Sequence, residues 1–369
     1  MSFDLGIANE MLSEARDIIT EKNTSKSMTD APRLIILGGQ PGSGKSSTIE
    51  LIESEYNKNI VAINGDDFKP LYPDYNLKMQ HSSEKTSIEV QPYSNHVVNA
   101  LKAEYSDKKY NLIIEGTMRT SDIPLSTVSE MKAKGYKAEA YVVAANYYAS
   151  RTGCLLRMET DKFNTGIGRP VPVDSHDAAY ANIPTAIQAL IDSGMLENIK
   201  ILTRDGSVIG ELSKRDDIVS IYTTHRDKLD YLEYKQINDD LTKILSMMEK
   251  RSATSEDIAK INELQTQLRS SFELELLKID PRDFKTTEEV LDYFKKLRPE
   301  QMKTLVIEDN TTSKPLYSKN VNIAGQEHSY LTPKKITETL AKHLNVQHLL
   351  PKNQISKTLE RANDMDFGL

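Results

Sequence analysis

One short segment, residues 39–46, constrains this chain more than any other. It reads G-Q-P-G-S-G-K-S and fits the phosphate-binding pattern G-x-x-x-x-G-K-[ST]. The apolar run at residues 34–37 precedes it, and a stretch with helical character follows from Ser47. A strand, a tight glycine loop and a helix in this order predict a fold in which loop N–H groups and the helix N-terminus surround phosphate oxygens.

Each part of this loop has a physical task. The residues expected to bind the nucleotide are Gly39, Gln40, Pro41, Gly42, Ser43, Gly44, Lys45 and Ser46. Lys45 supplies a positive charge for the β- and γ-phosphates, and the hydroxyl of Ser46 is the expected Mg²⁺ ligand. The alternative is a glycine-rich turn before an ordinary helix, but the complete motif with both flanks favours binding of ATP with Mg²⁺.

The pattern around the loop is alternating. Short apolar strands are expected at residues 34–37, 60–63, 112–114, 140–144 and 199–202, with helices between them, notably at 95–105 and 124–134. Strands that alternate with helices predict an α/β fold with a parallel, helix-flanked sheet, which places ligands at the carboxyl ends of the strands.

The 369 residues allow more than one structural region. An N-terminal amphipathic helix and linker are expected at 1–30, the α/β domain at 31–216, and a mostly helical region of unknown role at 217–369. Apolar residues at heptad-like spacing in the stretches 231–250 and 255–279 favour a packed helical pair over a coil that binds a partner. The apolar face of the first helix likewise favours packing within the chain.

The composition restricts the classes of partner and the cellular compartment that we expect for this chain. The net charge is −7 and the pI is near 5.7, so the chain has no overall basic field for nucleic acid. No stretch approaches the roughly 20 apolar residues of a membrane-spanning helix, and the N-terminus has no basic region followed by an apolar one. A single cysteine, Cys154, suits a reducing compartment. We therefore expect a cytoplasmic protein that binds neither nucleic acid nor membrane.

Two carboxylates follow the second expected strand. Asp66 and Asp67 follow the strand at 60–63 after Asn64 and Gly65, and they should face the same crevice as the phosphate loop. A carboxylate there can take a proton from an acceptor hydroxyl as it attacks the γ-phosphate, or help to hold Mg²⁺. The alternative is an Asp-rich turn, which is disfavoured because Asp66 follows the next strand along the chain after the phosphate loop.

The third expected strand also ends in polar residues. Glu115, Thr117 and Arg119 offer a carboxylate, a hydroxyl and a guanidinium that suit a polar substrate with its own phosphates, although an Arg119–Glu115 ion pair is the structural alternative. Arg157 and Arg169 lie farther along, in a region expected to cover the site. Taken alone, each is as consistent with a surface charge as with a phosphate ligand.

Together these segments resemble the zeta toxin family of P-loop kinases, of the epsilon–zeta toxin–antitoxin type. The matching residues are the loop at 37–46, Asp66 with Phe68 and Lys69, residues 92–95, residues 114–117 with Arg119, Thr120 and Asp122, residues 134–136, Arg157, Arg169, His176 with Asp177, and Asn182 with Pro184 and Thr185. The resemblance covers roughly residues 34–206.

The resemblance implies that ATP and Mg²⁺ phosphorylate the 3′-hydroxyl of the amino sugar in UDP-N-acetylglucosamine, which blocks cell-wall synthesis in the producing cell or in a target cell. It implies a helical antitoxin as partner. It makes Asp66 the general base and Lys45, Arg157 and Arg169 the γ-phosphate clamp. The implied substrate-contacting positions are Glu115, Thr117, Arg119, Thr127 and Asn99, the last standing where the family has a glutamate.

The sequence is also compatible with other functions. A kinase of the same shape could act on a nicotinamide dinucleotide, because Asn99 and Asp67 depart from the family pattern near the acceptor. The loop domain could also be a nucleotide-dependent switch whose C-terminal half binds a protein. A polynucleotide 5′-kinase is disfavoured by the acidic pI.

Overall fold

The computed structural model describes residues 3–22, 26–229, 231–273, 277–279, 289, 305–309 and 314–318. The chain divides into two compact units, Met1–Lys228 with Asp239–Ile261 and Leu229–Asn238 with Asn262–Leu369. The domain boundary expected after residue 216 stays a prediction.

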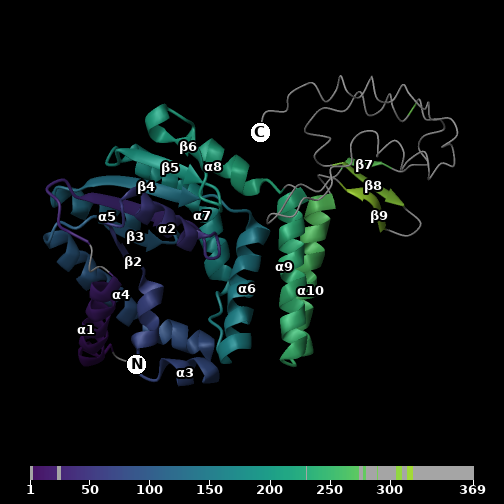
Figure 1. The fold of residues 1–369 in the computed structure, drawn as a ribbon, viewed down its shortest axis with the longest axis horizontal. Coiled ribbons are helices and arrows are strands. Elements are labelled where there is room, and N and C mark those ends of the chain that lie inside the picture. The colour runs from purple at the N-terminus through teal and green to yellow at the C-terminus, as the bar shows by residue number, and fades with distance from the viewer. Residues whose placement is uncertain are drawn as a thin grey trace. The chain divides into compact units, whose positions relative to one another are not determined.

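The first unit is built on a six-stranded sheet in the order β2-β3-β1-β4-β5-β6 (Figure 1). The strands are β1 Arg33–Gly38, β2 Val61–Ile63, β3 Leu112–Gly116, β4 Lys137–Val143, β5 Asn198–Leu202 and β6 Val208–Glu211. The pairs among β1 to β5 are parallel, as the alternating pattern predicts, and Leu34 is in register with Leu112 of β3 and Ala138 of β4. The predicted α/β class is confirmed. The antiparallel edge strand β6 was not predicted.

Helices cover both faces of this sheet. The helices of the unit are α1 Leu5–Lys22, α2 Lys45–Glu55, α3 Tyr75–His81, α4 Ser83–Asp107, α5 Asp122–Ala133, α6 Tyr147–Thr165, α7 Val173–Asp192 and α8 Ile218–Asp227, with the 3₁₀ turns η1 Gly65–Leu71 and η2 Leu212–Lys214. Successive β1 side chains point to opposite faces. Leu34 and Ile36 join the core under α4, α5 and α7, whereas Ile35 and Leu37 join a smaller core with Ile52 of α2.

The N-terminal helix packs within the chain, as its amphipathic pattern predicts. Ala8, Met11 and Ala15 of α1 are buried in the main core, and α1 contacts α4 and η1. Phe3 stacks on Tyr93 of α4 with ring centroids 4.9 Å apart. The helix thus adds an apolar layer to the α4 side of the fold.

The stretch Asp239–Ile261, which includes most of α9 (Tyr231–Lys250), also belongs to the first unit. Arg251 forms a two-pronged ion pair with Glu159 of α6, with its Nε 2.7 Å from Oε2 and its Nη2 3.0 Å from Oε1. Lys162 adds a second cation 3.3 Å from Oε1. Glu159 is only 1% exposed, so its charge is balanced by these two half-buried cations instead of by water.

The second unit contains helices and a small sheet. In it, Tyr234 near the start of α9 stacks on Phe272 near the end of α10 (Ser255–Glu273), and Gln265 donates a hydrogen bond to Asn238. These contacts confirm a packed helical pair. The helix expected to reach residue 279 ends at Glu273, because Leu277–Ile279 is a strand, β7. It pairs with β8 Leu305–Asp309, which pairs with β9 Lys314–Ser318, a sheet that was not predicted.

None of the helices described in the structure combines the length and the apolar character needed to cross a bilayer.

Candidate functional site

The phosphate loop joins β1 to α2 and lies against α6. Gly42 and Gly44 have φ angles of 75° and 100°, a left-handed conformation that side-chain-bearing residues rarely adopt. A Cβ atom on Gly42 would overlap the carbonyl oxygen of Ser150 and lie 2.8 Å from Sγ of Cys154. The loop can therefore rest on α6 only because Gly42 has no side chain.

Lys45 opens helix α2 and is 8% exposed. Its Nζ donates hydrogen bonds to the carbonyl oxygens of Gly39, at 2.8 Å, and Gln40, at 3.2 Å. Oε1 of Glu115 lies 3.7 Å from Nζ. Burial lowers the pKa of Lys45, and the Glu115 carboxylate acts in the opposite direction. The ammonium group is thus held inside the loop, at the place where phosphates would bind.

Asp66 lies just after β2, in the first turn of η1. The side chain of Asn64 accepts a hydrogen bond from the Asp66 backbone N–H and caps this turn. Lys69 Nζ lies 2.9 Å from Oδ1 of Asp66, and Arg169 Nη2 lies 3.3 Å from Oδ2. Burial by itself raises the pKa of Asp66, but Arg169 and Lys69 outweigh it, so that the net pKa lies below the usual value. The carboxylate is therefore ionised at neutral pH and able to accept a proton.

Glu115 at the end of β3 completes the acidic side of the cluster. Burial raises its pKa, against the effect of Lys45. Its Oε2 atom is buried and makes no hydrogen bond within the described part of the chain. Such an orphan acceptor marks a position that a donor on a ligand could satisfy. The side chains that follow Glu115 differ in exposure. Thr117 and Arg119 are exposed, whereas Met118 is buried against Gly38.

The remaining predicted residues lie on three helices. Arg157 of α6 is exposed, and its charge acts on Lys45, Asp66 and Glu115, so the structure brings it to the same cluster. Asn99 is exposed on α4, and Thr127 of α5 is 6% exposed. No ion pair or hydrogen bond in the described residues joins these two side chains to the loop or to Asp66. Their roles as substrate contacts stay predictions.

Lys69 has a contact that sequence reasoning did not assign to it. It comes three residues after Asp66 in a helical turn, a spacing that places the two side chains on one face. That spacing is the signal that could have identified the pair.

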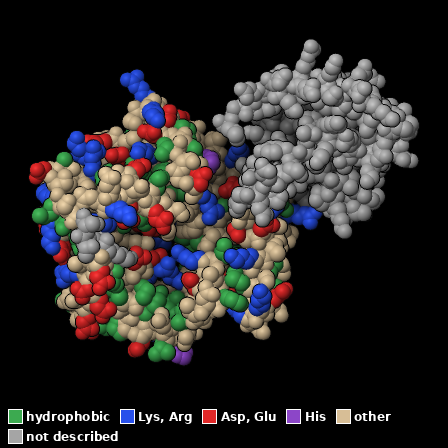
Figure 2. All heavy atoms as spheres, viewed as in Figure 1, with side chains coloured by type: hydrophobic (Ala, Val, Ile, Leu, Met, Phe, Trp, Pro, Cys, Tyr) green, Lys and Arg blue, Asp and Glu red, His purple; other side chains and the backbone are tan. Residues whose placement is uncertain are grey.

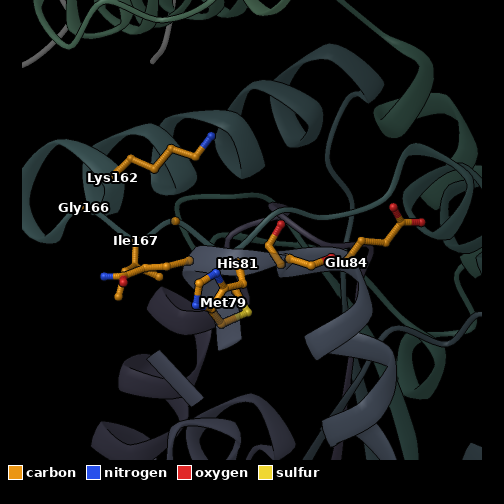
Figure 3. Close-up of a pocket in the computed structure, with 10 residues that line it drawn as sticks. Met79, His81, Glu84, Lys162, Gly166 and Ile167 are labelled. Atoms are coloured by element: carbon orange, nitrogen blue, oxygen red, sulfur yellow. The ribbon is translucent and has the colours of Figure 1, made fainter. Parts of the chain in front are cut away.

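A cavity of about 400 Å³ is lined by residues 79–84, by Lys162 and by residues 166–168. Figure 3 shows Lys162 of α6, and Gly166 and Ile167 just after that helix, near Met79 and His81 from the end of α3. Its lining includes no residue of the phosphate loop. Gly168, which also lines it, directly precedes Arg169, so the cavity adjoins the segment that contacts Asp66.

Comparison with known proteins gives consistent matches. The family model described as Zeta toxin matches residues 16–227. A protein named Toxin zeta from Enterococcus hirae is 33% identical over 233 residues, covering 63% of this chain and 82% of that protein. Toxin PezT from Streptococcus pneumoniae is 33% identical over 196 residues, covering 53% of this chain and 76% of that protein.

The fold has a solved counterpart. A chain from a structure of the PezAT chromosomal toxin–antitoxin system of Streptococcus pneumoniae superposes with a TM-score of 0.58 and 24% identity, covering 67% of this chain and 98% of that one. This likeness supports the α/β architecture. With a family model that spans more than half of its residues and relatives at about one third identity, the chain belongs to the zeta toxin family.

Proposed function

We propose that this protein is a kinase that transfers the γ-phosphate of ATP to a sugar hydroxyl of a nucleotide sugar, UDP-N-acetylglucosamine, and so acts as a toxin against cell-wall synthesis. One observation carries the proposal above the others: the carboxylate of Asp66 is held between Lys69 and Arg169, with Lys69 Nζ 2.9 Å from Oδ1 and Arg169 Nη2 3.3 Å from Oδ2. An ionised carboxylate beside a phosphate loop suits proton removal from an acceptor hydroxyl.

The chemistry follows from the sheet order. Because β2, β3 and β1 are parallel and adjacent in that order, Asp66, Glu115 and the loop lie together at the carboxyl ends of these strands. The acceptor oxygen would form a bond to the γ-phosphorus, its proton would pass to Asp66, and the bond from phosphorus to the bridging oxygen of ADP would break. Lys45, Arg157 and Arg169 supply positive charge where the transferred group spreads its negative charge.

The residues present also fit Mg²⁺. This ion usually takes only one or two protein ligands together with phosphate oxygens and water. The hydroxyl of Ser46 is exposed in the first turn of α2, beside Lys45, which is the position such a ligand needs. When bound, the ion neutralises charge on the phosphate oxygens.

The nucleic-acid alternative gains no support. Basic and acidic side chains are interspersed over the face of the described chain in Figure 2, and the net charge is −7. A protein that tracks a polynucleotide backbone usually presents a continuous basic groove.

The test is a transfer assay with purified protein, Mg-ATP and a panel of UDP-sugars and nicotinamide dinucleotides, read by mass spectrometry. We expect a mass gain of one phosphate on UDP-N-acetylglucosamine, lost by at least about 10³-fold in Lys45→Met because charge and positioning provide nearly all of this catalysis. Asp66→Asn, which keeps the shape but cannot take a proton, should also lose activity. Phosphate on a dinucleotide would replace the acceptor, and near-native transfer by Asp66→Asn would refute the base assignment.

The solved counterpart comes from a toxin–antitoxin system, and on that basis we infer that a protein antitoxin binds this chain.

The proposed toxicity is tested by growth. Expression of the protein in a bacterium should arrest growth, whereas expression of the Lys45→Met protein at an equal level should not. Equal growth arrest by both proteins would show that the arrest does not depend on the phosphate loop.

A further inference from the structure

A buried chain of hydrogen bonds links helix α7 to the phosphate loop. His176 of α7 is fully buried, with its Nε2 atom 2.8 Å from Oγ of Ser150 on α6 and its Nδ1 atom 2.9 Å from Oδ1 of Asp177. On the other side, Nε2 of Gln40 donates to Oγ of Ser150 at 3.2 Å and to the carbonyl oxygen of Ala145 at 2.8 Å. The reaction described above uses neither His176 nor Ser150.

The direction of these hydrogen bonds follows from the charge of the imidazole. Burial lowers the pKa of His176, while its hydrogen bond to Asp177 acts in the opposite direction, so the ring is neutral near pH 7. A carboxylate only accepts, so the single ring proton lies on Nδ1 and faces Asp177. Nε2 is then an acceptor for the hydroxyl of Ser150, which also lies within hydrogen-bond reach of the backbone carbonyl oxygens of Asn146 and Tyr147, at 3.0 and 3.1 Å, and whose oxygen accepts from Gln40. The chain therefore runs from Gln40 through Ser150 to His176.

Each end of this chain belongs to a part of the proposed site. Gln40 is the second residue of the phosphate loop, and Gly42 of the same loop rests on the carbonyl oxygen of Ser150. At the other end, His176 lies in the first turn of α7, and a segment with two prolines, Pro170 and Pro172, connects that turn to Arg169. Prolines restrict the backbone, so the start of α7 limits where Arg169 can lie.

Aromatic packing holds the imidazole in place. The ring of Tyr147 meets it edge-on, with centroids 5.4 Å apart, and the ring of Tyr180 lies nearly parallel to it at 6.4 Å. The side chain of Asn146 caps α6 by accepting from the N–H of Tyr148, which fixes the turn that carries Ser150. The histidine thus has one orientation, set by packing as well as by hydrogen bonds.

We propose that His176 is a positioning residue that holds the Arg169 segment in register with the phosphate loop, through Ser150 and Gln40. The inference rests on the proposed function in that its readouts are ATP binding and phosphoryl transfer. It assigns a task to a pair of residues, His176 and Asp177, that forms no hydrogen bond or ion pair with the loop or with Asp66 among the described residues.

The experiment compares four single variants of the full chain and the double variant His176→Phe/Ser150→Ala. His176→Phe keeps a planar ring between the two tyrosines but removes the acceptor, and His176→Gln returns an acceptor near Ser150. Ser150→Ala breaks the centre of the chain. Thr152→Val is the matched control, because Thr152 lies on the same helix, is 1% exposed, and its hydroxyl makes no hydrogen bond to the described residues.

Two quantities are measured for each protein: the Kd for a fluorescent ATP analogue, which needs no acceptor, and kcat with the acceptor that the transfer assay identifies. We expect His176→Phe and Ser150→Ala to weaken nucleotide binding roughly threefold to tenfold, the equivalent of one neutral hydrogen bond, and to lower kcat further. His176→Gln should recover most of the loss. The double variant should be no worse than either single one, because both break the same chain.

Several results would overturn the inference. If His176→Phe matches Thr152→Val in Kd and kcat, the histidine only packs. If His176→Phe does not fold, the Kd and kcat of Ser150→Ala are compared with those of Thr152→Val, and equal values again overturn the inference. Additive losses in the double variant would show two independent effects instead of one chain. If the wild-type protein fails to bind the analogue, the proposed function itself is refuted. If the wild-type protein binds the analogue and His176→Phe binds it equally well, only the role of His176 is refuted.

Discussion

Substitution of Gly42 by alanine tests the contact between the phosphate loop and α6. The added Cβ atom would overlap the carbonyl oxygen of Ser150 and lie 2.8 Å from Sγ and 3.0 Å from the backbone nitrogen of Cys154. Two of these three atoms are backbone, so they cannot turn aside as the end of a flexible side chain can. The residue also has a φ of 75°, which costs alanine about 1–2 kcal/mol.

The two costs add because they have separate causes. Overpacking of a tight contact costs about 1–3 kcal/mol beyond the backbone strain. We therefore expect Gly42→Ala to lower the free energy of unfolding by about 2–5 kcal/mol. Gly135→Ala is the matched control, since Gly135 has a φ of 84° but no atom within 4 Å of its added Cβ. That variant should cost only the strain, about 1–2 kcal/mol.

Urea unfolding of the two variants and the wild type gives the comparison. The midpoint should fall clearly more for Gly42→Ala than for Gly135→Ala, with an unchanged slope, since the slope reports the surface exposed on unfolding. Nucleotide binding should be lost in Gly42→Ala and kept in Gly135→Ala. Equal midpoints for the two variants would mean that the loop does not rest on α6 in solution, and the steric reasoning would be wrong.

Two further predictions concern charged groups. Lys69→Met removes the cation 2.9 Å from Asp66 and so raises the pKa of that carboxyl. Because the carboxylate is the active form, the acid limb of kcat/KM should move to higher pH, and an unmoved limb would show that Asp66 is not the titrating base. The profile has to begin at about pH 3, because the wild-type pKa of Asp66 lies below the usual value of about 3.9. Arg251→Met leaves the buried Glu159 with Lys162 alone, so stability should fall by about 2–3 kcal/mol, less than the 3–5 kcal/mol of a wholly unpaired charge. Calorimetry should show a drop in Tm of roughly 5–10 °C, partly restored in Arg251→Met/Glu159→Gln, and a drop below 1 °C would refute the pair.

Sequence reasoning reached the parts of the site that local pattern controls. The loop motif, the five parallel strands and the acids that end β2 and β3 follow from apolar runs and glycine spacing, which are local signals. The contacts of Arg169 with Asp66 and of His176 with Ser150 join segments far apart in the chain, and no periodicity encodes such pairs. In the sequence, Leu277–Ile279 continues the apolar pattern of the preceding helix and was expected to be helical. It is a strand because it pairs with β8, a tertiary contact that the local pattern does not contain.

The strand order described above also sets the sequence of events during synthesis. β1 carries the phosphate loop, yet its two neighbours are β3 and β4, so the loop has no paired strand beside it until Leu112 has been made. Pairing between strands so far apart in the sequence forms slowly, because the chain loses loop-closure entropy before the strand contacts compensate for that loss. A nascent chain that ends after β4 already contains Lys45, Asp66 and Glu115 but neither Arg157 nor Arg169. A growing chain thus completes its positively charged clamp only after the α/β core is largely translated, and a prematurely terminated product carries the phosphate loop without the arginines that the proposed transfer requires.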